Sequence, residues 1–165
     1  MNIKLKDGSI KEIQENSSVL DLAKSLSNSL AKAAIIGEVN GKYVDLNYKL
    51  KDGDEVNIIT LKDEKGVDTL RHSTAHIMAQ AVQRLFDNVK VTIGPSIENG
   101  FYYDFDVEKP FTNEDLQKIE AEMNKIVQEN LPYERMVVSK EEALKVMEEK
   151  GESYKLEIIN DFPEG

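Results

Sequence analysis

Two histidines, His72 and His76, are the only imidazole side chains in the 165 residues. Their spacing of four residues places them one helical turn apart on the same face of a helix. The apolar residues of this segment cluster on the opposite side, and they are Leu70, Ile77, Met78, Ala81, Val82 and Leu85. The two imidazoles therefore share a polar face, where they could serve as ligands or as hydrogen-bonding and acid–base groups. The alternative is a pair of surface histidines without a chemical role.

The residue types around the pair limit its chemistry. A zinc metalloprotease needs Glu directly after the first His, and Ser73 occupies that position. A zinc site would also need a third and a fourth ligand, usually Cys or His, and the sequence contains no Cys and no further His. We expect no metal on these residues alone, so further ligands or catalytic groups would have to come from outside the 165 residues.

The segment after residue 69 alternates short strands with helices. We expect the histidine helix over 70–86, with Asp68 or Thr69 as its cap. Asn99-Gly100 predicts a hairpin turn before an aromatic strand in which Tyr103 shares a face with Phe101 and Phe105. The other expected elements are strands at 90–93, 133–138 and 154–159, and helices at 112–130 and 139–150. In the last strand, Lys155 would face away from Leu156 and Ile158.

The first 62 residues predict an α+β domain of the β-grasp, ubiquitin-like kind. Alternation over 1–13 with a turn at Asp7-Gly8 indicates a hairpin, and Ser18 with Asp21 resembles a helix-capping box. Further strands are expected at 34–39, 42–44 and 55–60. This segment has no His, no Arg and no Gly-rich phosphate loop, which favours a docking or recognition role.

Charge is distributed unevenly along the chain. The net charge is −10, but residues 1–62 carry 9 Lys and 9 acids, so the excess of acids lies in the remainder. This shift predicts domains at 1–62 and 70–165 joined by a linker at 63–69. An acidic second domain disfavours independent binding to nucleic acid, since phosphates require basic side chains. No apolar run is long enough to span a bilayer, and we expect a cytoplasmic protein.

The segment 50–56 and the order of elements before it resemble the TGS domain. That module is shared by threonyl-tRNA synthetases, the guanosine tetraphosphate synthetase/hydrolase family and certain GTPases. The match by itself leaves these three functions open.

Four later segments carry a more specific resemblance, and they are 70–76, 93–95, 99–104 and 151–155. In this order after a TGS domain they resemble bacterial-type threonyl-tRNA synthetases over essentially the whole chain. The resemblance implies a TGS domain followed by the first part of the editing domain, with helices packed on an antiparallel sheet. The family's Asp-x-Cys-x-x-x-His segment, its aminoacylation domain and its anticodon-binding domain have no counterpart in these residues.

The resemblance also implies roles for particular residues in hydrolysing seryl-tRNA. His72 and His76 would form part of the pocket and orient water or the terminal ribose, and Lys155 would interact with substrate or water. Gly94, Pro95 and Tyr103 would line the pocket wall. A second, hydrolytic site is needed because one methyl group separates serine from threonine, a difference of only ~1–3 kcal/mol in a binding pocket.

For the parent enzyme, the resemblance implies threonine–tRNA ligation with ATP and Mg, a zinc ion in the catalytic domain, threonine tRNA as partner and a homodimer formed through that domain. We expect these 165 residues alone to bind tRNA weakly, to be monomeric or weakly self-associating, to be inactive in aminoacylation and to hydrolyse seryl-tRNA weakly if at all. A non-enzymatic, TGS-containing binding or regulatory module is the alternative.

Overall fold

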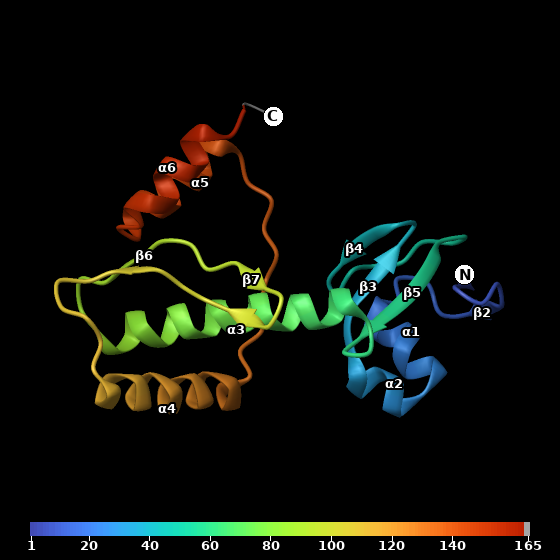
Figure 1. Cartoon of the computed structure of the whole chain (residues 1–165). Helices are drawn as coiled ribbons and strands as arrows, with labels where there is room; N and C mark the ends of the chain where they lie inside the picture. The colour runs from blue at the N-terminus through green and yellow to red at the C-terminus, as the bar shows by residue number, and fades with distance from the viewer. Residues whose placement is uncertain (164–165) are drawn as a thin grey trace. The chain divides into compact units, whose positions relative to one another are not determined.

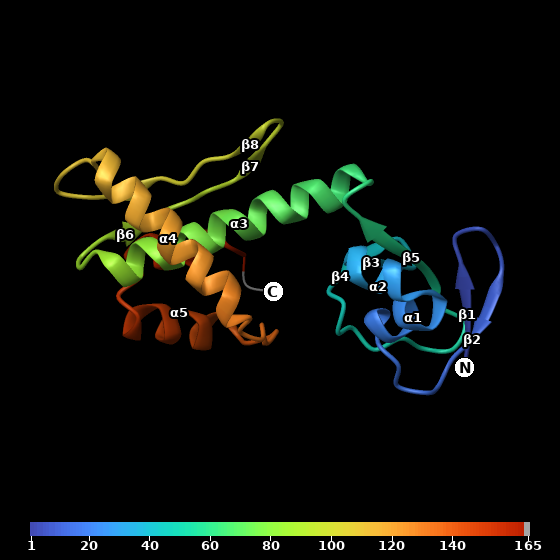
Figure 2. The same cartoon turned by 90° about the horizontal axis from the view of Figure 1, so that it is seen from below.

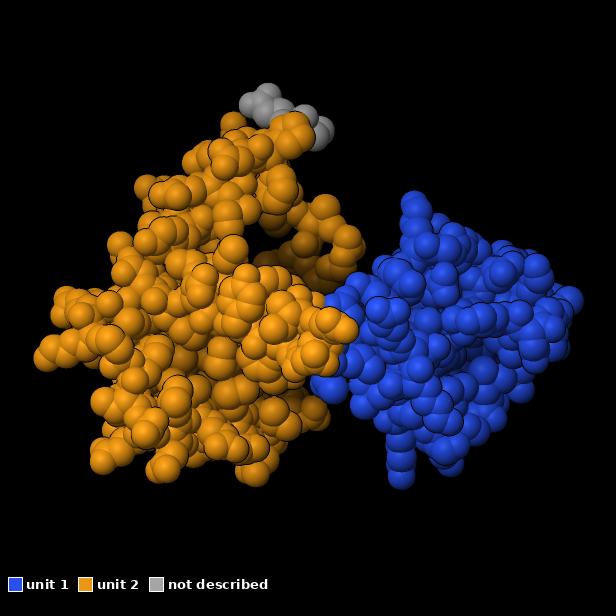
Figure 3. Space-filling view, viewed as in Figure 1, with its two compact units in different colours: residues 1–71 blue, residues 72–165 orange. Residues whose placement is uncertain are grey.

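The chain divides into two compact units in the computed structural model, residues 1–71 and 72–165, coloured separately in Figure 3. Residues 1–163 are described. The division falls inside a long helix, α3 (Glu64–Leu85), between Arg71 and His72. Each unit is considered by itself.

Unit 1 has the predicted β-grasp arrangement. A hairpin of β1 (Asn2–Leu5) and β2 (Ile10–Glu12) leads to α1 (Val19–Leu26) and α2 (Asn28–Ala33), and then to β3 (Ala34–Val39), β4 (Lys42–Val44) and β5 (Glu55–Thr60) (Figure 1). The sheet order is β2-β1-β5-β3-β4. Strands β1 and β5 run parallel, and the other pairs are antiparallel.

Local signals explain how this unit forms. The Ser18 side chain accepts a hydrogen bond from the backbone of Asp21, and the Asp21 carboxylate accepts one from the Ser18 backbone, which confirms the capping box of α1. Asn40 and Gly41 have φ of 50° and 78°, as the tight β3–β4 hairpin turn requires. The core contains Ile3, Val19, Leu22, Val39, Leu50 and Val56. Helix α2 was not predicted; Ser27 caps it.

Unit 2 combines helices with two small ladders. After α3, strands β6 (Lys90–Val91) and β9 (Phe105–Asp106) form one antiparallel pair, and β7 (Ser96–Ile97) and β8 (Gly100–Phe101) form another. Helices α4 (Asn113–Glu129), α5 (Lys140–Glu149) and α6 (Ser153–Asp161) follow (Figures 1 and 2). The β7–β8 hairpin turns at Glu98-Asn99, one residue before the predicted Asn99-Gly100 turn.

The core of unit 2 lies between α3 and α4. It is built from Ala81 and Val82 of α3 and Ile119 and Ile126 of α4, with aromatic side chains around it. At its edge, Arg84 makes a two-pronged pair with Glu129, at 2.8 and 2.9 Å. His72 and His76 are not part of this α3–α4 core.

The start of α3 differs from the prediction. Residues 64–69, assigned to a linker, form the first turns of this helix, which therefore begins six residues before Leu70. The Asp63 carboxylate accepts a hydrogen bond from the Thr60 backbone at 2.9 Å, so the chain turns from β5 directly into the helix. Gly66 fits there because a Cβ would lie 2.7 Å from the carbonyl carbon of Thr60. Residues 63–69 are mostly polar, and for this reason they resembled a linker rather than the first turns of a helix.

The predicted strand at 154–159 is wrong, because this segment belongs to α6. Helix α5 ends close to the predicted residue 150, and Gly151 follows it in the left-handed region, at φ 70°. The chain then re-enters a helix, where alternation of apolar and polar residues over six positions is compatible with either structure. Lys155 therefore lies on the first turn of a helix rather than on one face of a strand.

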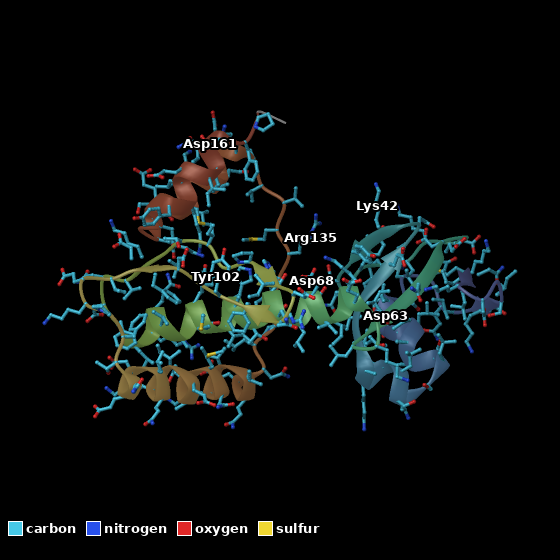
Figure 4. All side chains as sticks on the ribbon, viewed as in Figure 1. Lys42, Asp63, Asp68, Tyr102, Arg135 and Asp161 are labelled. Carbon is cyan, nitrogen blue, oxygen red and sulfur yellow. The ribbon has the colours of Figure 1, made fainter. Side chains whose placement is uncertain are left out.

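Two other strand predictions also fail. Segment 133–138, where Figure 4 labels Arg135, is exposed and pairs with no strand of the described residues. The aromatic run 101–106 is interrupted at Tyr102–Asp104, because its two ends pair with different strands, β7 and β6. The predicted antiparallel sheet of this unit is therefore reduced to two short ladders.

Candidate functional site

The two histidines lie together on the exposed face of α3, as their spacing predicted. Their Nε2 atoms are 3.0 Å apart, and their ring centroids are separated by 4.6 Å with an edge-to-face angle of 83°. Ala75 and Ala79, which follow His72 and His76 by three residues, are buried beside the pair. A hydrogen bond between two ring nitrogens needs one donor and one acceptor, so at least one ring is neutral in this geometry.

Charge and local burial favour the neutral form of His76. Partial burial of the ring lowers the pKa of His76 below 6.5, and the positive charges of His72 and Lys155 lower it further. The charge of Lys155 acts on His76 even though the two residues lie in separate helices. A hydrogen bond from Gln83 of α3 to Glu152, the N-cap of α6, places the first turn of α6, where Lys155 lies, against the histidine-bearing face of α3.

Glu152 connects the same two helices. Its Oε1 accepts a hydrogen bond from Nε2 of Gln83 at 2.6 Å, and its Oε2 lies 3.6 Å from Nζ of Lys155. The Glu152 side chain is only 10% exposed, against 38% for Lys155. Sequence reasoning assigned no role to Glu152 or Gln83. The one available signal was that Gln83 follows His76 by seven residues, two helical turns along the same polar face.

Tyr103 lies in the segment between β8 and β9 and is influenced by the charge of Glu152. Burial raises the pKa of the Tyr103 phenol, and the negative charge of Glu152 raises it further. The ring stacks on Phe105 with centroids 5.0 Å apart. Tyr102, labelled in Figure 4, is exposed. Alternation thus gave the correct partner for Tyr103, although the strand itself is interrupted.

Gly94 packs directly against Tyr103. A Cβ at this position would overlap Cδ2 of the Tyr103 ring and would lie 2.6 Å from its Cγ and 2.7 Å from the Tyr102 carbonyl oxygen. Backbone hydrogen bonds from Thr92 to Asp104, at 3.2 Å, and from Asp104 to Ile93, at 3.0 Å, hold the two segments together. Because Gly94 has no side chain, the Tyr103 ring can pack directly against its backbone. Pro95, the next residue, is exposed.

The predicted residues thus converge in part. His72 and His76 are in contact, and Glu152 joins Lys155 of α6 to Gln83 on the same face of α3. The group offers a neutral imidazole, an ammonium and a phenol, which suit proton transfer and stabilisation of negative charge. Within residues 1–163, no cluster of three or more His, Asp or Glu side chains is arranged to hold a metal ion. No helix in that range is both long and apolar enough to cross a membrane.

Comparison with known proteins agrees with the fold of unit 1. The family described as TGS domain matches residues 1–60. Unit 1 is therefore a TGS domain.

The whole chain is similar to threonine--tRNA ligases. It is 53% identical over all 165 residues to the protein of that name from Acetivibrio thermocellus, and 52% identical over 165 residues to the one from Carboxydothermus hydrogenoformans. Against the Clostridioides difficile protein, identity is 48% over 99% of this chain. The chain spans about 26% of the length of each relative. It is thus related over all its residues to the N-terminal region of threonine--tRNA ligases.

Proposed function

We propose that this chain forms the N-terminal part of a threonine--tRNA ligase, and that unit 2 contributes to hydrolysis of tRNA mischarged with serine. The observation that supports this proposal is that Glu152 joins Lys155 of α6 to the face of α3 on which His72 and His76 contact each other. Similarity to threonine--tRNA ligases over all 165 residues supports it, and a stand-alone binding module is not favoured.

The chemistry required is attack of water on the ester that joins serine to the terminal ribose. A neutral His76 can accept a proton as the water oxygen bonds to the ester carbon, and its lowered pKa keeps it neutral at pH 7. The Lys155 ammonium stabilises the negative charge that develops on the carbonyl oxygen. The bond to the ribose oxygen then breaks, and His76 returns the proton it took from water to that leaving oxygen. His72, bonded to His76, orients the ring or the ribose.

The remaining parts of the proposal concern the parent enzyme. It would attach threonine to tRNA with ATP and Mg, using a zinc ion in a catalytic domain, and would act as a cytoplasmic homodimer. Tyr103, with Gly94 and Pro95, would form the wall of the editing pocket. With 19 acids against 10 Lys and Arg, unit 2 has little to attract phosphates, so tRNA would be held mainly by other domains.

The test uses a chimera in which these 165 residues replace the matching region of the Acetivibrio thermocellus threonine--tRNA ligase. We expect the chimera to hydrolyse seryl-tRNA, and His72→Ala, His76→Ala and Lys155→Met each to lower that rate by about a hundredfold or more. Threonine charging, measured in parallel, verifies that the chimera is assembled. Undiminished hydrolysis in all three variants would overturn the proposal.

A second measurement uses the 165-residue chain alone. We expect it to charge no threonine and to hydrolyse seryl-tRNA weakly or not at all. Hydrolysis as fast as that of the chimera would show that these residues carry the complete site, contrary to the proposal.

A further inference from the structure

Glu152 stands at the N-cap of α6 but does not cap that helix. A carboxylate at this position ordinarily accepts hydrogen bonds from the first free N–H groups of the helix. The Glu152 side chain makes no such bond. It is directed instead to Gln83 of α3 and to Lys155 one turn further along α6. The Glu152 carboxylate therefore interacts with Gln83 and Lys155 instead of capping its own helix.

Because the Glu152 carboxylate is mostly buried, its two partners contribute to the stability of the structure. A carboxylate that is 10% exposed is costly unless a charge and a hydrogen-bond donor compensate for its lost hydration. The Lys155 ammonium supplies the charge and the Gln83 amide supplies the donor, at 3.6 and 2.6 Å. Since Gln83 lies on the histidine-bearing helix, the same carboxylate connects the first turn of α6 to α3.

We propose that Glu152 is a positioning residue that holds the Lys155 ammonium beside the His72–His76 pair, with Gln83 anchoring the carboxylate to α3. Glu152 acts only through Lys155 and donates nothing to the reaction. The negative charge of Glu152 also raises the pKa of Tyr103. The inference rests on the proposed function, because it assigns Lys155 its role in hydrolysis.

Kinetics in the chimera provide the first test. Glu152→Gln keeps the shape and removes the charge, and we expect kcat for seryl-tRNA hydrolysis to fall about tenfold to a hundredfold with little change in KM. Because Glu152 acts through Lys155, Glu152→Gln should have no further effect in a Lys155→Met background. Multiplicative losses in the double variant would overturn the inference. Glu149→Gln, which changes an exposed acid at the end of α5, is the matched control and should leave hydrolysis unchanged.

Side-chain order provides a readout that does not depend on activity. In the 165-residue chain, ¹³C relaxation at Cε of Lys155 should show a side chain that becomes less ordered in Glu152→Gln and in Gln83→Ala, but not in Glu149→Gln. Circular dichroism verifies that the helices remain. Unchanged order in both variants would refute the inference.

The two readouts separate this inference from the proposed function. If the unaltered chimera fails to hydrolyse seryl-tRNA, the proposed function fails, and the order of Lys155 still decides whether Glu152 positions it. If Glu152→Gln does not fold, Gln83→Ala tests the same connection from the other helix.

Discussion

The Nε2 atoms of His72 and His76 lie 3.0 Å apart on adjacent turns of α3. One ring donates and the other accepts, so the bond is lost if both rings become protonated, since imidazolium has no acceptor nitrogen. A positive charge from another residue near the pair therefore disfavours protonation of the rings. Lys155 supplies that charge from α6.

The titration of His76 should reflect this arrangement. Its pKa is lowered, so its ring should titrate below 6.5 in side-chain NMR spectra. In the unfolded chain the ring binds its proton at the higher, ordinary pKa, so folding stability should be lost as pH falls from 6.5 through the folded value. His72→Gln removes one positive neighbour and should move the pKa of His76 upward. A His76 pKa at or above 6.5 in the unaltered chain would contradict the geometry.

Lys155→Met should shift the same equilibrium. Removal of the ammonium takes away one of the groups that lower the pKa of His76, so this pKa should rise toward 6.5. The measurement is the same NMR titration on the 165-residue chain, with Lys145→Met on α5 as control. No response to Lys155→Met, or an equal response to the control, would place Lys155 away from the histidines.

Gly94→Ala should disturb the wall formed by Tyr103. The added methyl would lie 2.6 Å from Cγ of the ring, so the ring or the backbone must move. We expect a loss of unfolding free energy of about 1–3 kcal/mol and a pKa of Tyr103 closer to its ordinary value as the ring becomes hydrated. Chemical denaturation and tyrosine NMR measure the two effects. Glu98→Ala, an exposed change in the same hairpin, should produce neither.

Ser18→Ala should destabilise unit 1. The Ser18 hydroxyl caps α1 and is almost fully buried, with 5% exposure. Loss of an N-cap side chain costs about 0.5–2 kcal/mol. Thermal unfolding of the chain should detect this loss, and Ser29→Ala, an exposed serine at the start of α2, is the matched control. Equal stability of the two variants would mean that the capping box contributes nothing measurable.

The sequence predicted the elements that local signals specify. The β1–β2 and β3–β4 hairpins, the capping box at Ser18 and the end of α5 near residue 150 appear as expected. Predictions failed where local patterns were ambiguous. The six residues 154–159 satisfy both helical and strand periodicity, and 133–138 has strand-like composition but no partner among the described residues.

The amino-acid sequence by itself determined that His72 and His76 are neighbours, because helical periodicity places residues four apart on one face. It also determined the β-grasp order of unit 1. The tertiary structure alone decided that Gly94 packs against Tyr103 and that Glu152 joins α6, which carries Lys155, to α3. These contacts join segments far apart in the chain, and they depend on how whole helices pack rather than on the spacing of residues within one.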